Sequence, residues 1–284
     1  MFHLRSLLYD RQALSSTASA PEPLPVAVCQ FESGPDVAVN LRTVERLAGE
    51  AAQASARLAV FPEASVLPIH SDAPGLERVA SYFAEHREIV AGIARRAGIA
   101  IVAGLFEPSE IPGKVHNSVV VCGADGQALG TYRKIHLYDA FGVRESDRFA
   151  AGAIAPLTFS LGGLRFGVLT CYDLRFGELA RHLVDRGAEV LVVPAAWARG
   201  PLKEAHWSVL LRARAIENTV YVLGAGQCGA SCTGLSAIID PLGVALAGLG
   251  EAPGVATATV GLERLADVRR RLPVLENRRL RAMV

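Results

Sequence analysis

Short apolar stretches alternate with amphipathic ones along most of the chain. Residues 26–31 and 57–63 are mostly apolar and rich in Val, Ala and Phe, which is typical of buried strands. Between them the apolar residues recur at helical spacing, and the predicted inward positions are Val37, Leu41, Val44, Leu47, Ala48 and Ala51. The order strand, helix, strand predicts α/β architecture rather than separate blocks of helices and strands.

Further along, the pattern predicts another helix and two hairpins. Residues 77–97 are helical in pattern. The Asp-Gly pair at 125–126 separates the β-prone runs 117–123 and 128–137, and such a pair is a strong hairpin signal. Residues 157–170 suggest a second hairpin. Hairpins imply antiparallel pairs, so we expect mixed rather than purely parallel sheets.

The second half repeats this alternation and contains the clearest helix. Residues 178–186 predict a short helix after a strand that ends at Cys171. Residues 203–218 predict a longer one, with Trp207, Leu210, Leu211 and Ala215 on its apolar face and Arg212 and Arg214 elsewhere. Since no linker interrupts the pattern, we expect one domain over residues 25–284.

The first 24 residues differ from the rest. They contain serines, Arg5, Arg11 and a Pro-rich end, which loosely matches a transit peptide. They lack the continuous apolar segment of a secretion signal. We therefore expect residues 1–24 to be a flexible extension.

Composition narrows the functional classes. With 284 residues, of which 51% are hydrophobic, the chain can bury a sizeable core. A formal net charge of +1 is too balanced for nucleic-acid or anionic-lipid binding. No apolar run reaches the roughly 18 residues of a membrane span. Five cysteines, an odd number at scattered positions, favour a reducing, cytoplasmic location.

The sequence carries no recognisable metal motif. None of the seven histidines has the spacing of a zinc-binding helix, and no two cysteines have C-x-x-C spacing. Cys228 and Cys232 are therefore interpreted as structural. We expect neither a metal nor an organic cofactor.

Three residues at predicted strand ends form a chemically sensible set: Glu63, Lys134 and Cys171. A thiol is mostly protonated at neutral pH, so it needs a base to become a nucleophile. Glu63 is the candidate base, with a pKa expected to rise in a closed pocket, and Lys134 would face the oxyanion. His136 is the alternative base, in a Cys-His arrangement.

The motifs around these residues resemble those of the nitrilase superfamily of carbon–nitrogen hydrolases. Glu63 lies in VFPEAS, Lys134 in YRKIHLYD and Cys171 in CYDLRF, while RESDRFAAG and HWSVLLRARAIEN add further similarity. The resemblance covers Val26 to Arg279 and implies a four-layer αββα sandwich with a Glu-Lys-Cys triad. It implies that Glu145 positions the lysine and the attacking water. It also implies dimers formed through helices near the cysteine.

The residues that follow the cysteine indicate which branch of the superfamily the chain resembles most. True nitrilases tend to have Trp-Glu there, whereas Tyr172-Asp173 is similar to the ω-amidase and deaminated-glutathione amidase branch, which hydrolyses primary amides of carboxylic acids. Gly177 departs from that branch, which usually has proline, and this puts the pocket shape in question. Tyr172, whose backbone N–H is a candidate oxyanion donor, is also a candidate substrate-binding residue.

Two further side chains are candidates for substrate binding. Arg175 has the charge to bind a carboxylate and is kept as a candidate, but the favoured interpretation is a structural ion pair with Asp173 or Glu178. Trp197 follows a strand and either walls the pocket or packs in the core.

The predicted function is hydrolysis of a nonpeptide C–N bond in a small amide through a cysteine thioester, releasing ammonia. Three alternatives stay open. They are an N-carbamoyl amidohydrolase, acyl transfer to an amine, and a catalytically silent scaffold or binding subunit.

Overall fold

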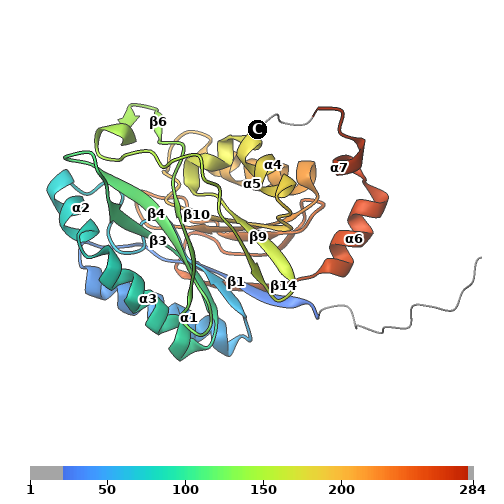
Figure 1. The fold of residues 1–284 in the computed structure, drawn as a ribbon, viewed down its shortest axis with the longest axis horizontal. Helices are drawn as coiled ribbons and strands as arrows, with labels where there is room; N and C mark the ends of the chain where they lie inside the picture. Colours follow the sequence, from blue (N-terminus) through green and yellow to red (C-terminus); the bar gives the residue numbers. More distant parts are fainter. Residues whose placement is uncertain (1–21, 281–284) are drawn as a thin grey trace, which may run out of the picture.

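A computed structural model describes residues 22–280 of the chain, and its first sheet contains both parallel and antiparallel pairs. The strand order is β14-β1-β2-β3-β4-β5 (Figure 1), and β2 is parallel to both β1 and β3. The strands are β1 (Leu24–Gln30), β2 (Leu58–Val60), β3 (Ala100–Pro108), β4 (Val115–Cys122), β5 (Ala128–Arg133) and β14 (Gly254–Val260). β4 and β5 form the predicted antiparallel hairpin.

The second sheet has the order β13-β12-β11-β10-β9-β8. Its strands are β8 (Thr158–Leu161), β9 (Leu164–Val168), β10 (Val190–Ala195), β11 (Tyr221–Gly226), β12 (Ala237–Ile239) and β13 (Ala245–Gly248). β8 and β9 form the second predicted hairpin. A small separate hairpin joins β6 (Asp139–Ala140) and β7 (Val143–Arg144).

Helices cover the outer face of each sheet, as Figure 1 shows. On the first sheet lie α1 (Val37–Gln53), α2 (Ala73–Ala80) and α3 (Phe83–Ala97). On the second lie α4 (Gly177–Asp185) and α5 (Lys203–Asn218). The chain continues into α6 (Leu262–Arg271) and α7 (Val274–Asn277), and the short 3-10 helices are η1 (Glu145–Asp147) and η2 (Cys171–Arg175).

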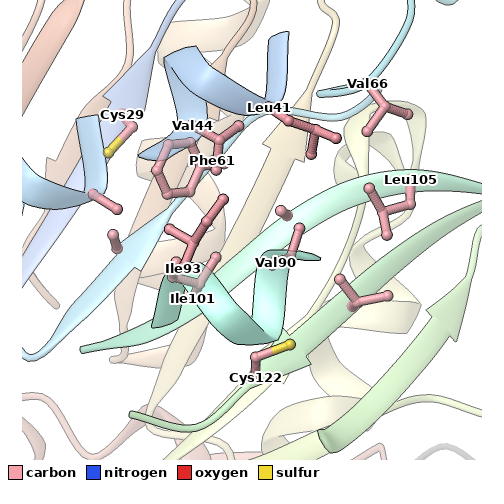
Figure 2. Packing of buried hydrophobic residues seen from close by; sticks show 14 of the residues in the cluster. Cys29, Leu41, Val44, Phe61, Val66, Val90, Ile93, Ile101, Leu105 and Cys122 are labelled. Atoms are coloured by element: carbon pink, nitrogen blue, oxygen red, sulfur yellow. The ribbon is translucent and has the colours of Figure 1, made fainter. Parts of the chain in front are cut away.

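Apolar side chains fill the spaces between these four layers. On β1, Val26 and Val28 point between the two sheets, whereas Ala27 and Cys29 point toward the helices, because successive side chains of a strand alternate between its faces. Figure 2 shows Cys29 in the helix-facing cluster with Val44 of α1. Burial of both faces explains why the predicted strands are mostly apolar rather than alternating between apolar and polar residues. The expected four-layer αββα sandwich with mixed sheets is confirmed.

Two helical expectations were wrong in detail. The helix predicted over 77–97 is two helices, α2 and α3. Asp72 caps the start of α2, and at its end the Ser81 hydroxyl donates to the Arg78 carbonyl. Arg214, expected away from the apolar face of α5, is buried, and its Nε donates to the Leu174 carbonyl at 3.0 Å. The periodicity of apolar residues predicts neither feature: the helix breaks where the Tyr82 backbone departs from helical angles, and Arg214 is held by a carbonyl distant in sequence.

The predicted extension, residues 1–24, lies outside the described residues except for its last three positions, where β1 begins at Leu24. Within residues 22–280, no helix has the length and apolar character needed to cross a membrane.

Candidate active site

Glu63 lies just beyond the end of β2, in the interior of the protein. Its side chain is 1% exposed. Gly104 of the neighbouring β3 lies so close that a Cβ there would be 2.6 Å from the Glu63 Cα. Real Cβ atoms do not approach a backbone so closely, so glycine is what lets the loop that carries Glu63 sit against β3.

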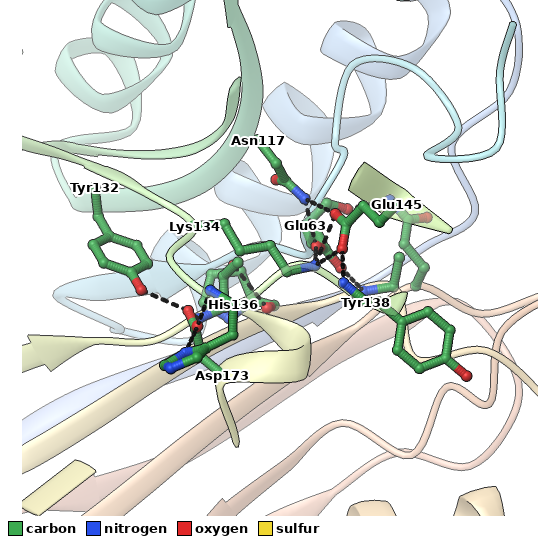
Figure 3. Close-up of polar contacts among 12 residues, drawn as sticks. Glu63, Asn117, Tyr132, Lys134, His136, Tyr138, Glu145 and Asp173 are labelled. Carbon is green, nitrogen blue, oxygen red and sulfur yellow. Dashed lines mark hydrogen bonds and ion pairs between the residues drawn. The ribbon is translucent and has the colours of Figure 1, made fainter. Parts of the chain in front are cut away.

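Lys134 follows β5 and joins two carboxylates. Its Nζ is 2.9 Å from Glu63 Oε1 and 2.9 Å from each carboxylate oxygen of Glu145 (Figure 3). Burial by itself would lower the pKa of this ammonium, but Glu145 and Glu63 outweigh it and raise the pKa well above the ordinary value. Lys134 is therefore charged. The carboxylate of Glu145 is fixed in turn by the Tyr138 backbone N–H, which donates to Oε2 at 2.5 Å.

Glu63 accepts hydrogen bonds from three directions. Besides Lys134, Asn117 Nδ2 donates to Oε1 at 2.6 Å and the Ala196 backbone N–H donates to Oε2 at 2.6 Å. Burial would raise the pKa of Glu63, but the Lys134 charge, with the hydrogen bonds from Lys134 and the Ala196 backbone N–H, lowers it below the ordinary value. The sequence-based expectation of a raised pKa was therefore wrong. Glu63 is a carboxylate, ready to accept a proton.

Cys171 begins η2 after β9, in an unusual backbone conformation. Its φ is 46°, in the left-handed region that non-glycine residues rarely occupy. The Thr170 side chain and Asp173 cap η2 reciprocally. The thiol lines the same cavity as the Glu63 carboxylate, and its pKa is raised well above the ordinary value by burial and by the Glu63 charge. The resting side chain is thus a neutral thiol beside a carboxylate.

A second polar cluster supports this turn. Asp173 Oδ2 accepts from the Tyr132 hydroxyl at 2.6 Å and from Thr170 N at 3.0 Å, while Oδ1 accepts from His136 N at 3.1 Å. His136 Nδ1 is 2.7 Å from the same oxygen, and its ring stacks on Phe176. Figure 3 shows His136 turned toward Asp173 and away from the two glutamates. This position favours Glu63 over His136 as the base.

The candidate residues share one cavity. It has a volume of about 280 Å³, suited to a small molecule. Its lining includes all the residues singled out from the sequence as catalytic or substrate-binding: Glu63, Lys134, Glu145, Cys171, Tyr172, Arg175 and Trp197. Segments far apart in the chain therefore meet around a single space that contains a thiol, a carboxylate and an ammonium.

Arg175 and Trp197 are neighbours on the cavity wall. The Arg175 guanidinium carbon lies 4.8 Å from the centre of the Trp197 ring, and Nη2 lies 3.4 Å from His206 Nδ1. The expectation of a structural ion pair with Asp173 or Glu178 was wrong, since no such pair forms among residues 22–280. Within that range the buried Nε has no hydrogen-bond partner. Trp197 both walls the cavity and packs on Trp207.

Gly177 has a structural rather than a pocket role. It starts α4 and is not among the residues that line the cavity. A Cβ at this position would lie 3.3 Å from Arg214 Nη1. Glycine therefore makes room for the buried arginine at the start of the helix.

The described cysteines and histidines form no metal centre. Across residues 22–280, no three His, Cys, Asp or Glu side chains are grouped so as to hold an ion. All five cysteines are free thiols, and Cys232 lines the cavity whereas Cys228 does not.

Sequence reasoning missed two functional neighbours. Asn117, on β4, bonds Glu63 and is 3.2 Å from Glu145 Oε1, a contact that only the sheet order creates. Lys203, treated only as part of a helix, lines the cavity. The supporting role of Asp173 had a readable signal in the Thr-x-x-Asp spacing of a capping box.

Comparisons with known proteins agree with this site. Residues 25–270 match the family described as carbon-nitrogen hydrolase. A deaminated glutathione amidase of Escherichia coli O157:H7 is 43% identical over 84% of this chain and 91% of its own length. The human protein of that name is 36% identical over 93% and 84%.

The solved structures add a similar fold. An amidase from Nesterenkonia sp. AN1, a mutant described as having acrylamide added to its active-site cysteine, has a TM-score of 0.77 and 30% identity, covering 88% of this chain and 98% of that one. The family match, the curated relatives and the fold all lead to one assignment: this chain belongs to the carbon–nitrogen hydrolase family.

Proposed function

We propose that this enzyme hydrolyses the C–N bond of a small amide through a thioester on Cys171, with Glu63 as the base. The observation that carries this proposal is the single cavity lined by the neutral Cys171 thiol, the carboxylate of Glu63 and the Lys134 ammonium, with Lys134 bound to Glu63. Membership in the carbon–nitrogen hydrolase family and amidase-named relatives support amide hydrolysis.

In the first half of the reaction, Glu63 takes the thiol proton as sulfur attacks the amide carbon. The carbonyl oxygen becomes negative near Lys134, and the Tyr172 backbone N–H is a second candidate donor to it. Loss of one oxyanion donor typically costs about 3 kcal/mol. As the C–N bond breaks, Glu63 returns the proton to the leaving nitrogen, and the acyl group stays on sulfur.

In the second half, water attacks the thioester and Glu63 accepts its proton. Sulfur leaves, takes up a proton, and the acid product departs. Glu145 would hold Lys134, and with it the geometry of Glu63, through both steps. In these steps the nucleophile is the Cys171 side chain and the base is the Glu63 side chain, while Lys134 and the Tyr172 backbone N–H stabilise the oxyanion.

A substrate screen tests the proposal. Release of ammonia or amine is measured with glutaramate, deaminated glutathione, an N-carbamoyl amino acid and a nitrile. Turnover of an amide is expected, and preference for the carbamoyl compound would instead indicate the alternative hydrolase. If none of the four compounds is hydrolysed, the proposed reaction class is rejected.

Arg175 and Trp197 are proposed to contact the substrate, because they line the cavity beside Cys171.

The pH dependence follows from the lowered pKa of Glu63. The carboxylate form is the active base, so activity is lost only as pH falls through a pKa below the ordinary 4.5. The raised pKa of Lys134 keeps its charge throughout neutral pH. With an uncharged amide as substrate, kcat/KM is expected to stay level within about twofold from pH 5 to 8. An acid limb centred between pH 6 and 7 would point to a histidine base instead.

The protein is also proposed to form a homodimer through α5 and the residue that precedes it. Leu202, Val209 and Ile216 are spaced two helical turns apart and are 70%, 62% and 43% exposed, which gives one apolar stripe. Gly243 lies against Ile216, and Val244 and Leu246, which follow Gly243 in the chain, are also exposed. Burial of such side chains stabilises association by about 1.5–3 kcal/mol each.

Val209→Glu is expected to convert a dimer into a monomer in sedimentation at micromolar concentration, because it would bury a charge in the interface. Val39→Glu, which alters an exposed valine on α1, is the matched control and should leave the dimer intact. A monomeric wild type would contradict the proposed interface.

A cytoplasmic location is proposed because all five cysteines are free thiols, as is usual for proteins of a reducing compartment.

A further inference from the structure

The cavity holds more positive than negative side chains. Its charged lining consists of Glu63 and Glu145 against Lys134, Arg148, Arg175 and Lys203. Both carboxylates bind Lys134. In the part of the chain that the structure describes, neither Arg148, Arg175 nor Lys203 forms an ion pair. The cavity therefore carries an uncompensated positive charge, which favours a negatively charged ligand.

Lys203 is the most enclosed of these unpaired cations. The residue is 4% exposed. Its Nζ donates to the Tyr138 hydroxyl at 2.5 Å and lies 3.9 Å from the centre of the Phe141 ring and 4.8 Å from that of Tyr138. Its backbone carbonyl accepts from Trp197 Nε1 at 2.9 Å, which fixes the start of α5.

These contacts leave the charge of the ammonium without an anionic partner. A hydroxyl and two ring faces stabilise a cation, but each is weaker than a carboxylate in a buried place. The group has three N–H donors, and one of them is used by Tyr138. An enclosed lysine at a cavity wall, held in place but without an anion, is prepared to receive one from the ligand.

We propose that Lys203 is a specificity-determining residue that binds a carboxylate of the substrate, an inference that rests on the proposed amidase function. Lys203 selects amides that carry a second, anionic end. The competing explanation is structural: Lys203 holds the β6–β7 hairpin in place. It would do so through Phe141, in the turn between the two strands, and Tyr138, which directly precedes β6. A structural role affects all substrates alike, whereas carboxylate binding affects only the anionic ones.

The test compares glutaramate with pentanamide, which has the same chain length and a methyl group in place of the carboxylate. For Lys203→Met, kcat/KM for glutaramate is expected to fall about 10- to 100-fold, mainly through KM. The value for pentanamide is expected to change less than about twofold. Lys203→Arg, which keeps the charge, should retain most of the preference for glutaramate.

Two controls keep the result interpretable. Arg46→Met removes a positive charge from the exposed face of α1 and should leave both substrates unaffected. If Lys203→Met does not fold, Lys203→Gln keeps a donor for Tyr138 without the charge and should show the same selective loss. Equal losses on both amides, or an undiminished preference for glutaramate, would overturn the proposal. A wild type that hydrolyses neither amide would instead reject the amidase function itself.

Discussion

Replacing Cys171 with alanine is expected to yield a folded protein whose amidase turnover is lower by about 10⁴-fold or more. The proposed reaction forms its covalent bond at this sulfur, so no neighbouring group replaces it. The side chain is small and nearly buried, and alanine differs from it only by the loss of the sulfur atom. The unfolding temperature should therefore shift by only a few degrees. Ammonia release and thermal unfolding measure the two effects separately.

Cys122→Ala is the matched control. Cys122 is a buried thiol on β4 and does not line the cavity. Its variant should keep full turnover after correction for folded protein. Amidase turnover by Cys171→Ala at the wild-type rate would reject the nucleophile assignment, whatever the identity of the substrate.

Glu63→Gln is expected to lower kcat by about 10²- to 10⁴-fold, because an amide cannot accept the thiol proton. KM should change little, since the volume of the side chain is kept. The variant should also lose about 1–3 kcal/mol in the free energy of unfolding, because the glutamine NH₂ replaces an oxygen that now accepts from Ala196 N. Single-turnover kinetics and denaturant unfolding test both expectations.

His136→Gln provides the comparison for the base. His136 contacts Asp173 and Phe176 and does not line the cavity, so its loss should act on stability more than on the chemical step. A loss smaller than tenfold in Glu63→Gln, together with a large one in His136→Gln, would transfer the role of base to the histidine.

Much of the fold was predictable from local pattern. Strands buried on both faces are mostly apolar, and the Asp-Gly pair at 125–126 marks its hairpin, so the α/β class and several strand boundaries follow from the sequence. The break between α2 and α3 was not predictable, because the apolar spacing continues across Ser81, whereas the backbone of Tyr82 (φ −95°, ψ 18°) leaves the helical region. The burial of Arg214 depends on a carbonyl of η2, distant in sequence.

The residues of the site that lie in sequence motifs were predictable, and the others were not. Glu63, Lys134 and Cys171 follow strands, and the cavity unites them. The sign of the Glu63 pKa shift was missed, because it depends on the Lys134 charge and on the hydrogen bonds to the carboxylate, which together outweigh burial. Lys134 and the Ala196 backbone N–H both come from segments far from Glu63 in the sequence. Lys203 was missed because its spacing on α5 says nothing about the cavity beside it.

The most direct test of the account is mass spectrometry of the wild-type protein quenched in acid during turnover of an amide. The account predicts a mass increase equal to that of the acyl group, located on the peptide that contains Cys171 and removed by neutral hydroxylamine. An acyl group carried by any other residue, with Cys171 unmodified during turnover, would contradict it.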